Sequence, residues 1–177
     1  YWQAAGGQLD LWRRARPIEG WLTDPAAGDA LKTRLRRVKE MRTFASQELG
    51  LPDNGSYRSF ADVQRPFLVW NVFAAPELSL TAKEWCFPVA GCVAYRGYFS
   101  ETSARALAGK LAEAGYDTYV GGVPAYSTLG WFDDPVPSTV IAYPDTDLAR
   151  LIFHELAHQV VYIPGDTTFN ESLATAV

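Results

Sequence analysis

The chain has 177 residues, of which 48% are hydrophobic and 20% are charged, and it carries a net charge of −4 at pH 7. This composition is typical of one globular domain that spans residues 1–177 and is large enough to bury a core. It excludes a disordered chain, and no stretch is long and apolar enough to span a membrane.

Helices are predicted in the first third of the chain. Residues 3–16 form a short helix that ends near Pro17, because proline disfavours helical backbone in the residue before it. A longer helix runs from Asp24 and Pro25 to about Leu49, since an aspartate cap followed by proline is a common start signal. Its buried stripe recurs at three- and four-residue spacing and comprises Leu31, Leu35, Val38, Met41, Phe44, Ala45 and Leu49.

The same long helix is basic. Its cationic residues are Arg34, Arg36, Arg37, Lys39 and Arg42. Such a row can bind nucleic acid or anionic lipid, but a solvated helix face is the more common explanation. We therefore expect no nucleic-acid partner.

From residue 66 the pattern changes to β-branched and aromatic runs. Strands are predicted at residues 67–73, 93–99, 117–123 and 139–143, and a short helix at residues 102–114. With a further helix after residue 145, these elements predict an α+β fold. In it, N-terminal helices and a small antiparallel sheet pack on a zincin-like active-site helix.

The two histidines of the chain lie four residues apart with a glutamate between them, in His154-Glu155-Leu156-Ala157-His158. The apolar residues around them and the cap candidates Asp145 and Asp147 predict a helix. Residues four apart share a helix face, so both imidazoles can hold one zinc ion (Zn2+) while Glu155 takes a proton from water. Two histidines in a wet corner of the core are the alternative, but a full match rarely arises by chance.

Glu171, in Asn170-Glu171-Ser172-Leu173-Ala174, is the candidate third ligand. Pro164 and Gly165 end the first helix, and Thr167 or Thr168 can cap a second one. A glutamate in the first turn of that second helix can face back to the histidines, which leaves one open position, as in catalytic zinc sites. Otherwise Glu171 only offsets the helix dipole.

These two motifs resemble those of the gluzincin metallopeptidases. Further stretches are similar to the predicted aminopeptidases of Gram-negative bacteria, namely residues 1–9, 16–18, 87–92, 95–99 and 126–135. The resemblance spans the whole chain. It implies His154, His158 and Glu171 as zinc ligands and Glu155 as the catalytic base, but it does not by itself establish a substrate. A peptide or protein substrate is expected from the zinc-peptidase interpretation as a whole.

The resemblance also carries expectations about location and length. Family members typically look like lipoproteins, which implies the periplasmic side of a bacterial cell envelope and a lipid anchor absent from this chain. Members continue well past the glutamate ligand, so the chain is expected to be a fragment truncated after it. In gluzincins a strand edge ahead of the metal helix typically pairs with the substrate backbone, and residues 119–126 are the candidate. Gly121 and Gly122 would allow close approach there, or form a bulge or turn.

The substrate-binding residues are defined less closely. Tyr126, Tyr143 and Tyr162 are candidate hydrogen-bond donors to a developing oxyanion, and the sequence does not rank them. An aminopeptidase must hold a free α-amine, which favours a buried carboxylate, and Asp133 or Asp134 is the candidate. Asp133-Asp134-Pro135 also fits an exposed turn. Other aromatic residues in predicted loops either line a cleft or fill the core: Trp85, Trp131 and Phe132.

Cys86 and Cys92 are the two cysteines of the chain. Their spacing does not fit a zinc knuckle but permits a local disulfide in an oxidising compartment. Two reduced, buried cysteines are the alternative, and the envelope location implied by the resemblance favours the disulfide.

We therefore expect a zinc-dependent metallopeptidase that acts as an aminopeptidase. The alternative is a non-catalytic envelope interaction module with a structural metal site. Glu155 favours the enzyme, because a structural site needs no base and usually closes its fourth position.

Overall fold

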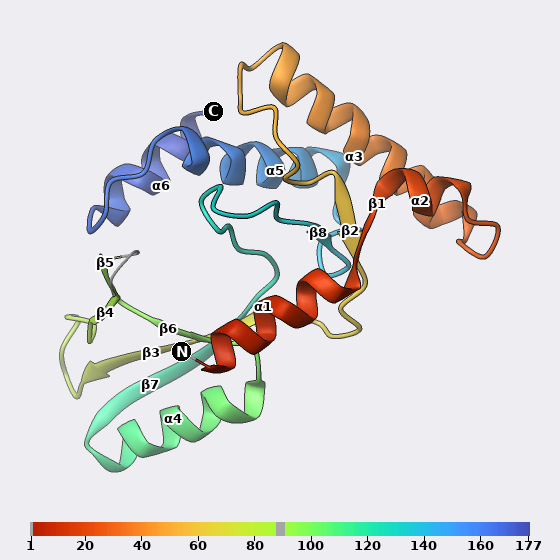
Figure 1. Ribbon diagram of the computed structural model, residues 1–177. Coiled ribbons are helices and arrows are strands. Elements are labelled where there is room, and N and C mark those ends of the chain that lie inside the picture. The colour runs from red at the N-terminus through yellow and green to blue at the C-terminus, as the bar shows by residue number, and fades with distance from the viewer. Residues whose placement is uncertain (1, 88–90) are drawn as a thin grey trace.

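The computed structural model describes residues 2–87 and 91–177 and has the predicted α+β fold. Helices α3 (Asp29–Gln47), α5 (Asp145–Val160) and α6 (Thr167–Ala176) lie together, and helix α4 (Glu101–Glu113) lies at the opposite end of the molecule (Figure 1). Helix α1 (Trp2–Arg14) runs between these two ends. Among the residues described, no helix combines the length and the apolar composition needed to cross a membrane.

The larger core lies where α3 and α5 pack on each other and on a small sheet. That sheet consists of β1 (Ala15–Pro17), β2 (Ser59–Ala61) and β8 (Val136–Pro137), with β2 antiparallel to β1 and parallel to β8. Helix α2 (Ile18–Thr23) follows β1 directly. The buried side chains of this core include Ile18, Leu35, Val38, Phe60, Val136, Leu148, Ile152 and Leu156. Three of them, from α5, recur every four residues, which makes α5 the central helix of this half.

The smaller core lies between an antiparallel sheet and α4. In that sheet β3 (Val69–Pro76) lies between β6 (Arg96–Tyr98) and β7 (Tyr116–Val123). Trp70 and Val72 of β3 are buried against Ala104 and Ala108 of α4. The opposite face of the sheet is turned toward α5, and a cavity separates the two.

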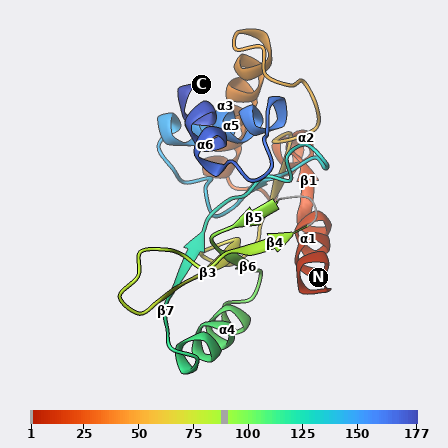
Figure 2. The same ribbon diagram turned by 90° about the vertical axis from the view of Figure 1, so that its left-hand side faces the viewer.

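A hairpin of β4 (Trp85–Phe87) and β5 (Gly91–Val93) lies between this sheet and the helices (Figure 2). Residues 88–90, between the two strands, lie outside the described residues. Gly91 has a positive φ of 73°, and a Cβ there would lie 3.0 Å from the backbone nitrogen of Gly165. Glycine is therefore needed where the hairpin meets the loop between α5 and α6.

The predicted start of the long helix is wrong by one turn. Helix α3 begins at Asp29 behind Gly28, and Asp24 instead organises the turn between α2 and α3. The Asp24 carboxylate accepts a hydrogen bond from the Ala26 N–H at 2.9 Å and pairs with Arg16 at 2.6 Å. Aspartate and proline are common to helix starts and to turns, and here the turn uses them.

Two predicted strands also differ from the structure. Residues 139–143 form turns, in which the N–H groups of Val140 and Tyr143 bond to carbonyls three residues earlier. Val140 is nevertheless fully buried, so its apolar character serves the core rather than a sheet. The predicted strand over residues 93–99 is divided into the end of β5 and β6, with Ala94 and Tyr95 between them.

Most cationic side chains of the basic helix α3 contact acidic side chains or backbone carbonyls. Arg34 and Arg37 both contact Asp145 at the start of α5, and Lys39 contacts Glu19. Arg42 is only 1% exposed, which corrects its assignment to a solvated face. Its guanidinium donates to the carbonyls of Pro52, Asn54 and Ser56 and so anchors the loop that follows α3.

Candidate metal centre

Helix α5 presents both histidines to the cavity because its opposite side is fixed in the larger core. Leu148, Ile152 and Leu156 are fully buried, which determines the rotation of the helix about its axis. The Nε2 atoms of His154 and His158 lie 3.1 Å apart. The predicted four-residue pairing on one helix face is thus present.

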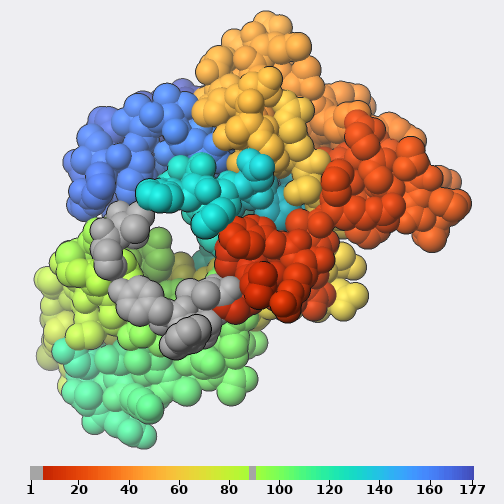
Figure 3. Space-filling view, in the orientation of Figure 1, coloured from red at the N-terminus to blue at the C-terminus, as the bar shows by residue number. Residues whose placement is uncertain are grey.

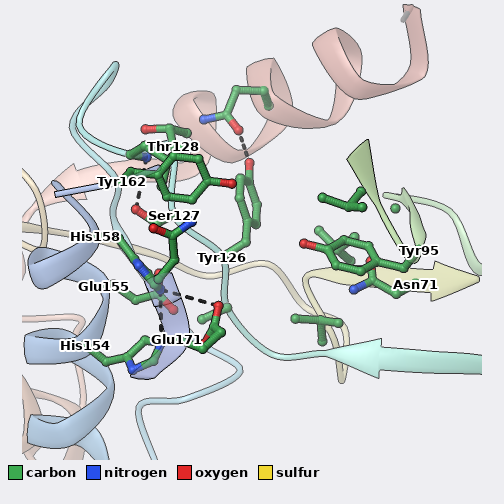
Figure 4. A pocket seen from close by; sticks show the side chains of 18 of the residues that line it. Asn71, Tyr95, Tyr126, Ser127, Thr128, His154, Glu155, His158, Tyr162 and Glu171 are labelled. Atoms are coloured by element: carbon green, nitrogen blue, oxygen red, sulfur yellow. Dashed lines mark hydrogen bonds and ion pairs between the residues drawn. The ribbon is translucent and has the colours of Figure 1, made fainter. Parts of the chain in front are cut away.

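A short turn then brings Glu171 to the histidines. Asp166, rather than a threonine, caps α6, since its carboxylate accepts a hydrogen bond from the Phe169 N–H at 2.9 Å. The Glu171 carboxylate lies 3.2 Å from His154 Nε2 and 3.7 Å from His158 Nε2 (Figure 4).

The buried Asn170 positions this carboxylate. Its Oδ1 accepts a hydrogen bond from the Ile163 N–H, and its Nδ2 donates to the Ile163 carbonyl, both at 2.8 Å. This pair of bonds closes the loop between the two helices and places the next residue, Glu171, at the histidines. Sequence reasoning assigned no role to Asn170, although its position next to Glu171 in the motif was a signal.

The spacing of the three side chains fits one metal ion. Ligand atoms about 2.0–2.1 Å from a tetrahedral zinc lie about 3.3 Å from one another. In the structure the two histidine nitrogens and a Glu171 oxygen all lie within 4.8 Å of one another, with two of the separations at 3.1 and 3.2 Å. Burial also lowers the pKa of His158, and the nearby His154 adds to this effect, so the imidazole stays neutral as a ligand requires.

Glu155 lies beside the ligands and faces the same cavity. Burial raises its pKa to about 7, with smaller contributions from the charges of Glu171 and Asp134. A carboxyl group with a pKa in this range both accepts and donates protons readily near neutral pH.

The cavity next to these residues has a volume of about 780 Å³. It opens between α1, the loop of residues 124–135, the sheet and the α5–α6 pair, and the hollow is visible in the space-filling view (Figure 3). A cavity of this size can hold a peptide segment of a few residues or a ligand the size of a drug molecule.

The tyrosines predicted as oxyanion donors are not equally placed. Tyr162 lines the cavity, with its ring 6.3 Å from that of His158, whereas Tyr143 packs against the larger core. Tyr126 also lines the cavity, but its hydroxyl donates to Gln8 of α1.

Tyr95 is a cavity residue that sequence reasoning missed. It extends from the β5–β6 connection with its hydroxyl toward the metal centre (Figure 4). Burial raises the pKa of Tyr95, and the charges of Tyr162, Glu171 and Glu155 add to the rise. Its sequence signal was its place in the family-like stretch of residues 95–99, but it also lies inside a run that resembles an ordinary strand.

Neither aspartate proposed to hold a substrate amine lines the cavity among the described residues. The carboxylate of Asp133 lies against Gly55, where a Cβ would come within 2.3 Å of its Oδ2. Asp134 is 2% exposed, and its Oδ2 accepts hydrogen bonds from the Thr128 N–H at 2.7 Å and the Thr128 hydroxyl at 3.0 Å. Asp134 therefore shapes the cavity loop from behind.

Cys86 and Cys92 form a disulfide that joins β4 to β5 at directly paired positions. The bond thus lies in the hairpin that contacts the loop between α5 and α6, and Val93 of the same hairpin lines the cavity.

Two histidines and a carboxylate from consecutive helices, with a buried glutamate at an adjoining cavity, define a candidate metal-dependent hydrolase site. A protein-family model described as "Putative aminopeptidase" matches residues 1–177, and the chain belongs to this family. No curated protein and no solved structure matches the chain.

Proposed function

We propose that the protein is a zinc-dependent peptidase that acts as an aminopeptidase. The observation that carries the proposal is the convergence of His154, His158 and Glu171 beside the buried Glu155 at the wall of a large cavity. Membership of the aminopeptidase family supports the peptide substrate.

His154, His158 and Glu171 would hold the ion. Bound zinc supplies Lewis acidity, which polarises an amide carbonyl and makes a water molecule easier to deprotonate. Glu155 accepts the proton of the attacking water and then delivers it to the leaving amine. The buried environment that raises the pKa of Glu155 to about 7 suits both steps.

Tyr162 and Tyr95 are the proposed donors to the negative charge that develops on the carbonyl oxygen. They approach the metal centre from opposite walls of the cavity (Figure 4). A phenol held in place before the reaction stabilises the transition state without reorganisation. Tyr126 is less suited, because its hydroxyl is already committed to Gln8.

Strand β7 and the segment after it are proposed to bind the substrate backbone. β7 is an outer strand of its sheet, and the chain continues from Val123 into residues 125–129, which line the cavity. An outer strand offers unpaired N–H and C=O groups to an extended peptide. Gly121 and Gly122 keep regular pairing with β3, and Gly122 leaves room for the ring of Phe67 rather than forming a bulge.

The cell envelope is the proposed location of the protein. The disulfide of the β4–β5 hairpin supports an oxidising compartment, because disulfides rarely persist in the cytosol.

The proposal is tested by zinc analysis and by peptide hydrolysis with Glu155→Gln as the comparison. We expect about one zinc per molecule in both proteins and hydrolysis only in the unsubstituted one. Zinc retention without hydrolysis by the unsubstituted protein would instead indicate a structural metal site.

A further inference from the structure

Four aromatic rings form one wall of the cavity, here called the aromatic wall: Trp12, Phe99, Tyr126 and Phe132. Trp12 and Phe132 meet edge to face with centroids 4.6 Å apart, and Phe99 and Tyr126 do the same at 5.8 Å. The four residues come from α1, the segment before α4, and the loop of residues 124–135. Their common placement is therefore a product of the fold.

The aromatic wall is held in position from behind. Gly7 of α1 lies so close to Phe99 that a Cβ there would come within 2.0 Å of the ring. The Tyr126 hydroxyl donates to Gln8, one residue further along α1. The buried Asp134 fixes Thr128 in the loop that carries Tyr126 and Phe132. A wall with such contacts loses little conformational entropy when a ligand binds to it.

The chemistry of the cavity is divided between its two sides. Among the described lining residues, the acidic and imidazole side chains all belong to the metal centre: His154, Glu155, His158 and Glu171. The aromatic wall is continued by apolar side chains, namely Val69, Val93, Val123 and Leu129. No lysine, arginine or aspartate is present among those lining residues. A charged substrate side chain at this wall would lose its hydration without gaining an oppositely charged partner from it.

We propose that the cavity selects substrates with a bulky aromatic or branched aliphatic side chain next to the scissile amide, and that Trp12 and Phe132 determine this preference. The inference rests on the proposed function for the bond that is cleaved. The preference itself follows from the aromatic wall, where a large ring gains both burial and edge-to-face contacts. Acidic side chains are the least favourable, because Glu155 and Glu171 face the same space.

The test is a peptide series X-Ala-Ala-Ala-Ala in which X is Phe, Leu, Ala, Lys or Glu. Each peptide is offered with a free and with an acetylated N-terminus, and mass spectrometry identifies the bond that is cut. We expect kcat/KM for cleavage beside Phe or Leu to exceed that beside Ala by about 10- to 100-fold, a range typical of apolar pockets. Cleavage beside Glu should be the slowest.

Substitutions test whether Trp12 and Phe132 determine the preference for a bulky side chain. Trp12→Ala and Phe132→Ala should each reduce the Phe-to-Ala ratio of kcat/KM by about tenfold while zinc content stays unchanged. Trp131→Ala is the matched control, because Trp131 lies beside Phe132 but is 70% exposed and outside the cavity lining. Equal effects of Trp131→Ala and Phe132→Ala would overturn the assignment of these residues.

A binding measurement distinguishes a failure of the side-chain preference from a failure of the proposed peptidase function. The same peptides are titrated calorimetrically into zinc-loaded Glu155→Gln protein. Tighter binding of the Phe peptide without hydrolysis by the unsubstituted protein supports the apolar cavity and refutes the peptidase function. Hydrolysis without any preference for X refutes the cavity inference and leaves the peptidase function standing. Neither binding nor hydrolysis refutes both.

Discussion

Asn170 and Ile163 form a closed pair, in which both polar atoms of the Asn170 amide bond to the backbone N–H and carbonyl of Ile163. The pair encloses the turn at Pro164 and Gly165 and fixes the start of α6 relative to the end of α5. Because Glu171 follows Asn170 directly, this pair sets the distance between the third proposed ligand and the two histidines.

Asn170→Ala should therefore weaken zinc binding without removing a ligand. We expect a 10- to 100-fold increase in the dissociation constant for zinc, the usual effect of removing a group that orients a ligand. Competition with a chromogenic chelator measures it. Thr168→Ala, an exposed position on the same helix, is the control and should leave the affinity unchanged. An unaltered affinity in Asn170→Ala would show that Glu171 does not depend on the pair.

His158→Ala should abolish stoichiometric zinc binding, since it removes one of three ligands and leaves a gap in the buried part of the site. Elemental analysis after refolding with zinc and dialysis gives the content per molecule.

Glu155→Gln should retain the metal and lose hydrolysis by a factor of about 10² to 10⁴, the range for removal of a general base. If Glu155→Gln hydrolyses peptides at the original rate, another group is the base.

Tyr95→Phe should lower kcat by about 10- to 1000-fold with little change in KM, because a donor to the transition state contributes little to ground-state binding. The phenylalanine keeps the ring and removes only the hydroxyl. Tyr143→Phe serves as the control, since Tyr143 packs against the larger core and lies outside the cavity lining. A proportional rise in KM would instead assign Tyr95 to substrate binding.

Asp134 should make stability depend on pH. Burial raises its pKa from the ordinary value of 3.8 to about 6, so the folded state binds a proton more tightly than the unfolded state does. This contribution is fully present below pH 4 and is lost as the pH rises through 6. It amounts to about 3 kcal/mol.

The measurement is urea unfolding of the unsubstituted protein and of Asp134→Asn at pH 4 and pH 7. Asparagine can still accept the bonds from Thr128 but does not ionise. The free energy of unfolding of Asp134→Asn, minus that of the unsubstituted protein, should therefore be larger at pH 7 than at pH 4. In other words, the substitution should stabilise the folded protein more at pH 7. The raised pKa of Glu155 acts in the same direction but is common to both proteins. Parallel pH profiles would mean that the buried carboxyl does not titrate in this range.

The disulfide should be present in protein made in an oxidising compartment. Alkylation without reduction, followed by mass spectrometry, should leave Cys86 and Cys92 unmodified. Two alkylated thiols would remove this support for the proposed envelope location.

The candidate metal centre could be predicted from the sequence because its parts are close along the chain. His154 and His158 are neighbours on one helix, and Glu171 follows after a single turn, so helix geometry and a proline-glycine break suffice. The fold class followed in the same way from local periodicity. The start of α3 was placed one turn too early, because Asp24 and Pro25 are as common in turns as at helix starts.

The features that could not be predicted from the sequence depend on contacts between segments that lie far apart in the chain. Val140 and Ile141 have strand-forming side chains, but the core uses them in a turn whose hydrogen bonds are local. Arg42 is buried because a loop ten or more residues away supplies carbonyl acceptors, which helical spacing does not reveal. Trp12 and Phe132 stand 120 positions apart in the chain and meet only in the folded protein.

The two halves of the cavity belong to different cores. His154 and His158 are carried by α5, whose buried side chains pack with α3, whereas Val69 and Asn71 lie on a sheet whose other face packs with α4. The width of the cavity is thus set by how these two cores are joined. A third, smaller cluster of Leu11, Ala61, Val63 and Leu68 connects them, and the cavity residues Val69 and Tyr126 pack against it. The separation between the proposed catalytic groups and the sheet that faces them therefore depends on packing outside both cores.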